Sequence, residues 1–257
     1  MYAHRGGAAL RPENTIASFD NGLALGADGL EFDVHLSRDG VVVVHHDQTL
    51  ERTTNARGPV SACTAEELAA LDAAHWFRAE NGDAGDFPYR GRGIGIPRLR
   101  NVLARYPGIP MIIELKVNEP ALAIGAVDEV RAAGAVDRVS VGSFGWRVLN
   151  ALREYEPRIP TGASREEARW ALYRSWIHWA PRHPPYREFQ VPERSGGTTI
   201  ISPRFIACAH RANLPVKVWT VDDAVDIRRL ARWGVDGIIS DRPDVAVQAL
   251  KGLTPSA

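Results

Sequence analysis

Three carboxylates in this sequence, Glu31, Asp33 and Glu114, have the spacing of a metal site. Residues two apart on a strand point to the same side, so Glu31 and Asp33 project together and repel each other unless a cation lies between them. Glu114, near the end of the apolar run Met111–Leu115, is the expected third ligand. Oxygen ligands suit Mg²⁺ or Ca²⁺, and the sequence predicts one such ion. Each acid alone would be an ordinary solvent-facing charge on an edge strand.

Two histidines, His4 and His46, stand where predicted strands end, and a charged residue, Arg5 or Asp47, follows each of them. Phosphodiester cleavage needs a base for the attacking oxygen and an acid for the leaving alkoxide, and two histidines can divide these roles near neutral pH. We interpret them as an acid/base pair, whereas a lone histidine of this kind would be a buried core residue. Asp47 is expected to support His46, and His45 to point to the opposite side and be structural.

Two cations, Arg5 and Lys116, are positioned to stabilise the negative charge that develops on a phosphodiester oxygen. Lys116 follows Glu114 by two residues and shares its face, so a simple ion pair with a carboxylate is the alternative. Trp219, at the end of the run Val216–Thr220, is a candidate apolar wall for a glycerol or alcohol group, although a core position is the default for tryptophan.

The composition limits the class of partner. The 257 residues include 31 Lys and Arg against 31 Asp and Glu, so no global field attracts nucleic acid or an anionic membrane. We expect a small-molecule substrate, no nucleic acid and no stable membrane anchor, and the oligomeric state stays open. Met1-Tyr2-Ala3 leads directly into the His4 segment, and no later apolar run is long enough to span a bilayer, so the expected location is cytoplasmic.

Short apolar runs alternate with longer amphipathic ones along the chain, which is the pattern of βα units. Eight strand positions result if Val41–His45 pairs as a hairpin extension of the second, and the sequence therefore predicts an α/β fold, a (β/α)8 TIM barrel. The predicted strands are Tyr2–His4, Leu30–Leu36, Val41–His45, Met111–Leu115, Arg138–Val141, a weak one near Ile159–Gly162, Thr199–Ser202, Val216–Thr220 and Gly237–Ser240. The predicted helices are Thr15–Leu25, Leu99–Tyr106, Pro120–Ala133, Trp146–Tyr155, Arg165–Ser175, Pro203–Ala212, Asp222–Trp233 and Pro243–Leu250.

Two stretches interrupt this alternation. Residues 53–96 form an insertion after the second strand, expected to cover one mouth of the barrel, with a helix at Thr64–Ala74 and an irregular loop at Glu80–Gly95. A linker between two domains is the alternative, but we expect a single domain over residues 1–257. Trp176–Gly197 mixes aromatic and basic residues with prolines, and we expect it to pack onto the barrel rather than bind nucleic acid.

The sequence resembles the glycerophosphodiester phosphodiesterase family over residues 4 to about 244. The ordered set of blocks is highly specific, although any one block is weak. The matching blocks are His4-Arg5-Gly6, Pro12-Glu13-Asn14-Thr15, residues 26–34, Val44-His45-His46-Asp47, Arg52-Thr53-Thr54, Glu114-Leu115-Lys116, Val218-Trp219-Thr220 and residues 234–241.

The resemblance implies a TIM barrel with an insertion after the second strand and a metal-dependent hydrolysis of glycerophosphodiesters to glycerol 3-phosphate and an alcohol. It implies that a free glycerol hydroxyl can attack phosphorus to give a cyclic phosphate. The implied roles are acid/base for His4 and His46, ligation of a divalent metal for Glu31, Asp33 and Glu114, phosphate binding for Arg5 and Lys116, orientation for Glu13 and a pocket wall for Trp219.

One departure and two alternatives remain. Ser143-Phe144-Gly145 stands where relatives often have Ser-Phe-Asp, so one acidic group at that mouth is missing. Lysophospholipase D activity would require a broad apolar ramp, for which the aromatic residues of Trp176–Phe189 are the candidates. A non-catalytic barrel that binds a phosphate ester should have lost a histidine or a metal acid, and each of them is present.

Overall fold

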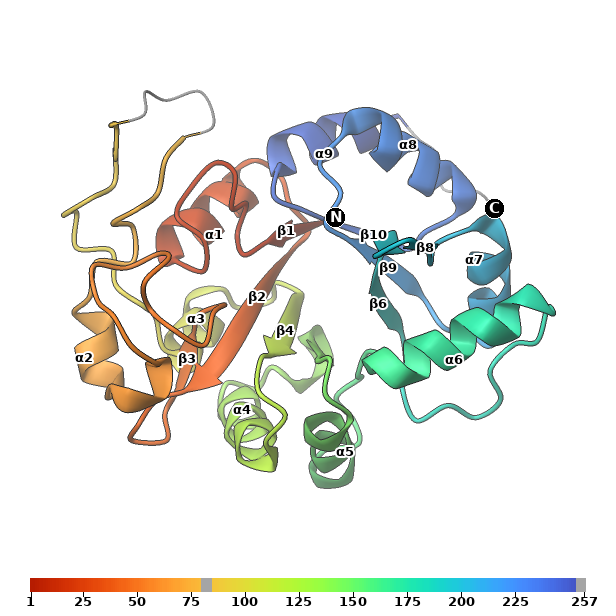
Figure 1. Cartoon of the computed structure of the whole chain (residues 1–257), viewed down its shortest axis with the longest axis horizontal. Helices are drawn as coiled ribbons and strands as arrows, with labels where there is room; N and C mark the ends of the chain where they lie inside the picture. Colours follow the sequence, from red (N-terminus) through yellow and green to blue (C-terminus); the bar gives the residue numbers. More distant parts are fainter. Residues whose placement is uncertain (80–84, 253–257) are drawn as a thin grey trace.

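Parallel strands form the centre of the molecule and helices surround them (Figure 1). This computed structural model describes residues 1–79 and 85–252. Each strand leads into a helix that runs back along the outside, which is how parallel strands are connected. The predicted α/β barrel is confirmed.

The barrel closes where the first strand pairs with the last. Seven strands follow one path, and residues 161–162 occupy the remaining place through parallel bridges from Thr161 to Val141 and from Gly162 to Glu188. These pairings give eight parallel positions, as predicted. In the order of the path, the strands are β5 (Val139–Gly142), β4 (Met111–Leu115), β2 (Gly29–Leu36), β1 (Tyr2–His4), β10 (Gly237–Ser240), β9 (Val216–Trp219) and β6 (Phe189–Pro192).

Capping side chains begin several helices of the outer ring. Thr15, Ser164, Ser202 and Asp223 each accept a backbone N–H of the first turn, which stabilises a helix start by roughly 0.5–2 kcal/mol. In residues 1–79 and 85–252, no helix has the length and apolar character needed to cross a membrane. The ring contains α1 (Ile16–Ala24), α3 (Leu99–Arg105), α4 (Pro120–Ala132), α5 (Trp146–Tyr155), α6 (Arg165–Trp176), α7 (Pro203–His210), α8 (Ala224–Trp233) and α9 (Pro243–Leu250), with the 3-10 turn η2 (Val136–Arg138) before β5.

Apolar side chains between the strands and the helices form two large clusters of the core, and a smaller third cluster lies under the segment after β2. One large cluster includes Phe19 of α1 packed against Phe32 of β2, and the other includes Phe189 of β6 packed against Phe205 of α7. Burial of each such ring contributes roughly 1.5–3 kcal/mol. The core therefore holds the strand ends at fixed positions, and the polar side chains described below depend on it.

The segment after β2 begins with the predicted hairpin. β3 (Val42–Val44) pairs antiparallel with β2, and η1 (Val60–Ala62) and α2 (Ala65–Ala69) follow. Thr64 caps α2, and the helix is shorter than predicted, because residues 94–96 cross its end and the Ile96 N–H bonds Leu68 O. Residues 80–84 of the predicted loop lie outside the described residues, and residues 85–95 contain no helix or strand.

The predicted strand at Thr199–Ser202 is wrong. The sixth barrel strand is β6, ten residues earlier, and Thr198–Thr199 is instead β8, which pairs antiparallel with β7 (Arg194–Ser195). Phe189 and Val191 are buried and alternate with half-buried residues, which is a strand pattern that the neighbouring prolines hid in the sequence. Ser202 serves as the cap of α7 rather than as a strand residue.

The predicted packing role of Trp176–Gly197 holds for only part of this stretch. Tyr186 and Phe189 are buried in the core beside Phe205. Trp176 and Trp179, in contrast, are 54% and 55% exposed. These two tryptophans are not used to hold the loop against the barrel.

Candidate active site

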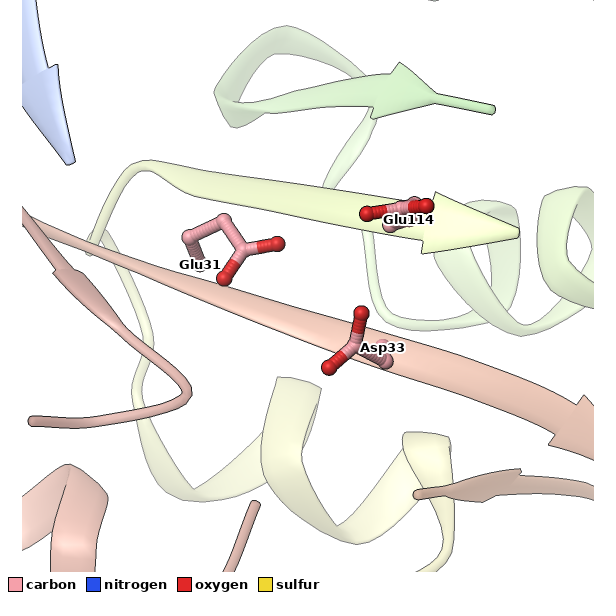
Figure 2. Close-up of side chains that lie close together, drawn as sticks. All are labelled: Glu31, Asp33 and Glu114. Carbon is pink, nitrogen blue, oxygen red and sulfur yellow. The ribbon is translucent and has the colours of Figure 1, made fainter. Parts of the chain in front are cut away.

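Two neighbouring strands bring the three carboxylates together (Figure 2). Glu31 and Asp33 share one face of β2, and Asp33 is the cross-strand partner of Glu114 on β4. One ligand oxygen from each residue lies within 4.8 Å of the others. Glu31 and Asp33 are only 5% and 1% exposed, so they are not solvent-facing edge charges. The predicted convergence of the three acids is confirmed.

The cluster carries more negative charge than its surroundings readily accommodate. Burial, together with the charges of Asp33 and Glu114, raises the pKa of Glu31 to about 8. Burial and Asp33 also raise the pKa of Glu114. Burial acts in the same direction on Asp33, but Lys116 and Arg5 outweigh it and lower the pKa of Asp33. The cations thus favour the ionised form of Asp33, whereas burial and mutual repulsion disfavour the ionised forms of Glu31 and Glu114.

A hard divalent cation fits this set of donors. Asp33 is anchored through Oδ2, which accepts the Asn14 side-chain N–H at 2.9 Å. Within the described chain its other oxygen, Oδ1, is buried and accepts no hydrogen bond, although Lys116 Nζ lies 3.4 Å away. An anionic oxygen that is buried, unsatisfied and surrounded by further carboxylate oxygens is what Mg²⁺ or Ca²⁺ binds.

His4 lies at the last position of β1, directly opposite Glu31 on β2. Its Nδ1 is 2.7 Å from Asp241 Oδ1, just after β10, and its Nε2 is 3.7 Å from Glu31 Oε2. Burial lowers the pKa of His4, but Glu31 and Asp241 outweigh burial and raise it to about 9. The imidazole is therefore a proton donor held by two carboxylates.

His46 forms the second histidine–carboxylate pair. Its Nδ1 lies 2.5 Å from Asp47 Oδ1, and Arg52 Nε donates to Asp47 Oδ2 at 2.5 Å. Burial lowers the pKa of His46 more than the carboxylates raise it, so its ring is neutral near pH 7. His45 turns away and pairs with Thr49 O at 3.2 Å, in the orientation that the alternation predicted.

Arg5 joins the two histidine segments to the carboxylates. Its Nε is 3.2 Å from Asp33 Oδ2, its Nη1 donates to Glu13 Oε1 at 2.8 Å, and its backbone N–H donates to Glu31. Glu13 also accepts two hydrogen bonds from Arg52, at 2.6 and 2.7 Å. Arg5 has φ 49°, in the left-handed region, and Gly6 follows with φ 84°. A Cβ on Gly6 would lie 2.4 Å from a Ser18 oxygen, so this tight turn requires glycine.

Lys116 completes the ring of cations around the cluster. It follows the end of β4, and its Nζ donates to Glu114 Oε1 at 3.2 Å. Burial lowers the pKa of Lys116, but Asp33 and Glu114 outweigh burial and raise it. The lysine is therefore charged and lies beside both carboxylates, as its shared face with Glu114 predicted.

A cavity of about 970 Å³ opens above these groups at the carboxyl ends of the strands. His4, His46, Arg5, Lys116, Glu31 and Glu114 line its inner end. Trp219, the last residue of β9, lines its wall and packs edge-on against Phe144 at 5.9 Å between ring centroids. In the part of the chain that the structure describes, neither Glu13 nor residues 53–79 and 85–96 line the cavity. Glu13 thus acts on the cavity through the arginines that it holds, Arg5 and Arg52.

Three further residues hold the site, and sequence reasoning missed them. Asn14 bonds Asp33, Asp241 bonds His4, and Arg52 links Asp47 to Glu13. Each lies in one of the family-like blocks, and that was the available signal. Their partners stand 19, 237 and 39 residues away, so these pairings form only when the chain folds, and the pairing of His4 with Asp241 also needs the barrel to close.

Comparison with known proteins places this arrangement in a family. The model of the Glycerophosphoryl diester phosphodiesterase family matches residues 4–245. The chain belongs to this family. The glycerophosphodiester phosphodiesterase of Caldanaerobacter subterraneus is 30% identical over 262 residues, covering 98% of this chain and 97% of the relative. YhdW of Bacillus subtilis is 34% identical over 254 residues, covering 96% of each protein.

A solved structure of the family has the same fold. The crystal structure of a glycerophosphodiester phosphodiesterase from Agrobacterium tumefaciens superposes with a TM-score of 0.75 at 31% identity. The comparison covers 95% of this chain and 97% of that one. The family match includes His4, Asp33 and Asp241, so it spans the whole cluster from the first strand to the turn after the last.

Proposed function

We propose that this chain hydrolyses glycerophosphodiesters to glycerol 3-phosphate and an alcohol in the cavity above Glu31, Asp33 and Glu114. The observation that carries the proposal is the meeting of a carboxylate cluster, two histidine–carboxylate pairs and two cations at the carboxyl end of one barrel. Active sites of TIM barrels lie at this end. Membership of the family supports the same reaction.

Glu31, Asp33 and Glu114 would hold one divalent cation, Mg²⁺ or Ca²⁺, through their carboxylate oxygens. When bound, the cation supplies Lewis-acid charge that polarises a phosphoryl oxygen and offsets the repulsion between the carboxylates. The unsatisfied Oδ1 of Asp33 and the raised pKa values of Glu31 and Glu114 support this assignment.

Arg5 and Lys116 bind the phosphate and stabilise charge on its oxygens during substitution at phosphorus. Arg5 is fixed in place by Glu13 and Asp33, so little reorganisation is needed when the substrate binds. Glu13 is a positioning residue, because it contacts Arg5 and Arg52 and does not line the described part of the cavity. Trp219 offers an apolar face to the glycerol or alcohol carbon atoms.

His46 acts as the base and His4 as the acid. His46 removes a proton from the attacking hydroxyl at its Nε2, since Nδ1 is engaged by Asp47. Attack by the glycerol hydroxyl forms a new P–O bond, the P–O bond to the alcohol breaks, and His4 gives its proton to the departing oxygen, which leaves a cyclic phosphate. Water then opens the cyclic phosphate to glycerol 3-phosphate, with His4 as the base and His46 as the acid. Asp241 and Asp47 orient the two rings and stabilise their cationic forms.

An assay of glycerophosphocholine hydrolysis with and without EDTA tests the reaction and the metal together. We expect EDTA to abolish turnover and a panel of metals to restore it, with Mg²⁺ or Ca²⁺ most effective. His4→Ala and His46→Ala should each lower kcat by about 10²–10⁴-fold. His210→Ala, which removes a histidine paired with Asp236 at the surface, is the control. Full turnover by both active-site variants would refute the acid/base roles, and EDTA-insensitive turnover would refute the metal.

One observation favours a second substrate class. Tyr173 and Trp176 line the outer part of the cavity and give it the aromatic wall that an acyl chain requires. Assay of lysophosphatidylcholine beside glycerophosphocholine separates lysophospholipase D activity from hydrolysis of deacylated substrates. A non-catalytic phosphate-ester barrel would turn over neither compound.

A further inference from the structure

The helix α6 and the turn after it expose a row of large apolar side chains. Five residues form this aromatic ridge, and each exposes about half or more of its side chain: Trp170 (65%), Tyr173 (45%), Trp176 (54%), Ile177 (68%) and Trp179 (55%). Scattered exposed apolar residues are normal on a protein, but a contiguous patch marks an interaction site. The family reaction described above makes no use of most of these residues.

The ridge is an ordered surface. The rings of Trp170 and Tyr173 meet edge-on at 6.3 Å between centroids, and Tyr173 meets Trp176 at 5.1 Å. On the opposite side of α6, Ala171, Leu172 and Ser175 are buried. This buried face fixes the helix against the barrel, so the three aromatic rings project outward together.

The surroundings of the ridge are basic, although the whole chain has no net charge. Residues 165–187 contain five arginines against two glutamates, an excess of three positive charges. Glu167, one of the two acids, is already paired with Arg153 at 2.9 Å. Arg174 lies over the ring of Trp179 at 5.9 Å, which places a cation within the aromatic surface. Electrostatic attraction acts over about 10 Å at 0.1 M salt, so this local excess decides what the ridge attracts.

The ridge is continuous with the mouth of the cavity. Tyr173 and Trp176 line the cavity, whereas Trp170 and Arg174 line a separate groove of about 370 Å³ on the other side of the helix, with Arg182. The aromatic ridge therefore stands between the entrance to the active site and the outer surface. Anything that binds it lies beside the entrance.

We propose that the aromatic ridge docks the protein reversibly on an anionic lipid bilayer, with the cavity mouth beside the membrane surface. Tryptophan and tyrosine favour the headgroup region, where the ring is in a partly apolar environment and the polar atom stays hydrated, and arginines bind anionic headgroups. The choice of a lipid surface rests on the proposed function, because a glycerophosphodiester carries the headgroup of a phospholipid. The neutral net charge does not oppose this docking, since the attraction is local.

Vesicle sedimentation tests the docking without reference to catalysis. The full chain is mixed with phosphatidylcholine vesicles and with vesicles containing one third phosphatidylglycerol, at low and at high salt. We expect binding to the anionic vesicles at low salt that weakens by at least tenfold at high salt. Trp170→Ser with Trp179→Ser should reduce this binding at least tenfold and leave kcat/KM for soluble glycerophosphocholine unchanged, because neither residue lines the cavity.

Trp76→Ser is the matched control. Trp76 is 48% exposed and follows α2 by seven residues, and α2 lies across the barrel from α6 (Figure 1), so vesicle binding should persist in this variant. Failure of the wild-type protein to bind anionic vesicles, or equal binding by the double variant, would overturn the proposal. A dimer in light scattering that the double variant abolishes would overturn it too, because a second copy would then occupy the ridge. If the wild-type protein does not hydrolyse glycerophosphocholine, that result contradicts the proposed function and not the docking.

Discussion

Asn14 shows how a single amide controls the carboxylate at the centre of the site. Its side chain donates to Asp33 Oδ2 and accepts the Asp33 backbone N–H at 3.3 Å, while its own backbone has φ 56°. Asparagine tolerates this left-handed conformation better than most residues. The residue therefore fixes both the rotamer of Asp33 and the turn that carries Arg5.

Replacing Asn14 tests this positioning role. Asn14→Ala should weaken metal affinity by about 10–100-fold, because residues that orient a ligand have effects of this size. Asn213→Ala is the control, since Asn213 also has a left-handed backbone, with φ 54°, and lies away from the cluster. Metal affinity is measured by calorimetry. Equal affinity in the two variants would show that Asn14 supports only the backbone.

The lowered pKa of His46 predicts how kcat/KM changes with pH. Burial lowers it below the usual 6.5, so the neutral base persists at neutral pH and kcat/KM should fall only as the pH drops through this lowered pKa. The hydrogen bond that His46 donates to Asp47 raises the pKa of His46, so Asp47→Asn should move the acidic limb to still lower pH. The pH dependence of kcat/KM, measured for the wild type and for Asp47→Asn, locates the acidic limb of each. Asp236→Asn, at the surface His210 pair, should leave the limb in place, and an unmoved limb in Asp47→Asn would exclude His46 as the base.

The residues that could be predicted from the sequence are those whose chemistry depends on local spacing. Glu31 and Asp33 follow from the two-residue period of a strand, and Lys116 follows in the same way from Glu114. Asp241 could not be predicted as the partner of His4, because only closure of the barrel brings residues 237 positions apart into contact. Their catalytic and metal-binding roles stay predictions until the variants are assayed.

A buried ion pair joins β9 to Glu188, the residue just before β6. Lys217 Nζ lies 2.6 Å from Glu188 Oε2, and Gln190 donates to the other oxygen of Glu188. Both charged groups are largely buried, with 12% and 6% of their side chains exposed. The pair therefore belongs to the inside of the barrel, and its members depend on each other.

Breaking this pair should destabilise the protein more than a surface pair does. Lys217→Met leaves Glu188 buried without its cation and should lower the free energy of unfolding by about 3–5 kcal/mol. Adding Glu188→Gln should recover part of the loss. Arg38→Met, at an exposed pair with Glu67, should cost about 0–1 kcal/mol. The free energy of unfolding of the wild type and the three variants is measured by urea denaturation. A loss for Lys217→Met no larger than that for Arg38→Met would contradict the argument.

Elements with a clear period were predictable, and the sixth strand shows where such prediction stops. α8 ends at Trp233, as predicted, with Gly234 as its cap at φ 89°, and β3 forms the expected hairpin with β2. β6 is four residues long and ends in Pro192, so its two buried residues gave too little signal. The apolar run at 199–202 gave a stronger strand signal. In the structure, however, it is β6 that pairs with β9 in the barrel.

At the scale of the whole molecule, the carboxylate cluster links stability to metal. A ligand at 100 times its Kd stabilises the folded state by about 2.7 kcal/mol, which corresponds to a rise in Tm of about 5–10 °C for a chain of this size. We expect this rise with Mg²⁺ or Ca²⁺ over EDTA. Because burial and Asp33 raise the pKa of Glu114, Glu114→Gln should raise the Tm in EDTA and remove the response to metal. The Tm of the wild type and of Glu114→Gln is measured with metal and with EDTA. A wild-type Tm that does not rise with metal would exclude a metal at this cluster.

Three expectations about the whole molecule stay predictions. They are a single domain over residues 1–257, a cytoplasmic location and the absence of a stable membrane anchor. The reversible docking proposed for the aromatic ridge is compatible with the last, because it needs no membrane-spanning helix.

The pairing of His4 with Asp241 has a consequence for protein synthesis. The first strand leaves the ribosome early, but its histidine obtains its carboxylate only when almost the whole chain has followed. Until then β1 lacks its neighbour β10, and an edge of the unfinished barrel stays open. A nascent chain that stalls before the last strand would therefore contain all three acids and both histidines, and still lack the Asp241 that orients His4.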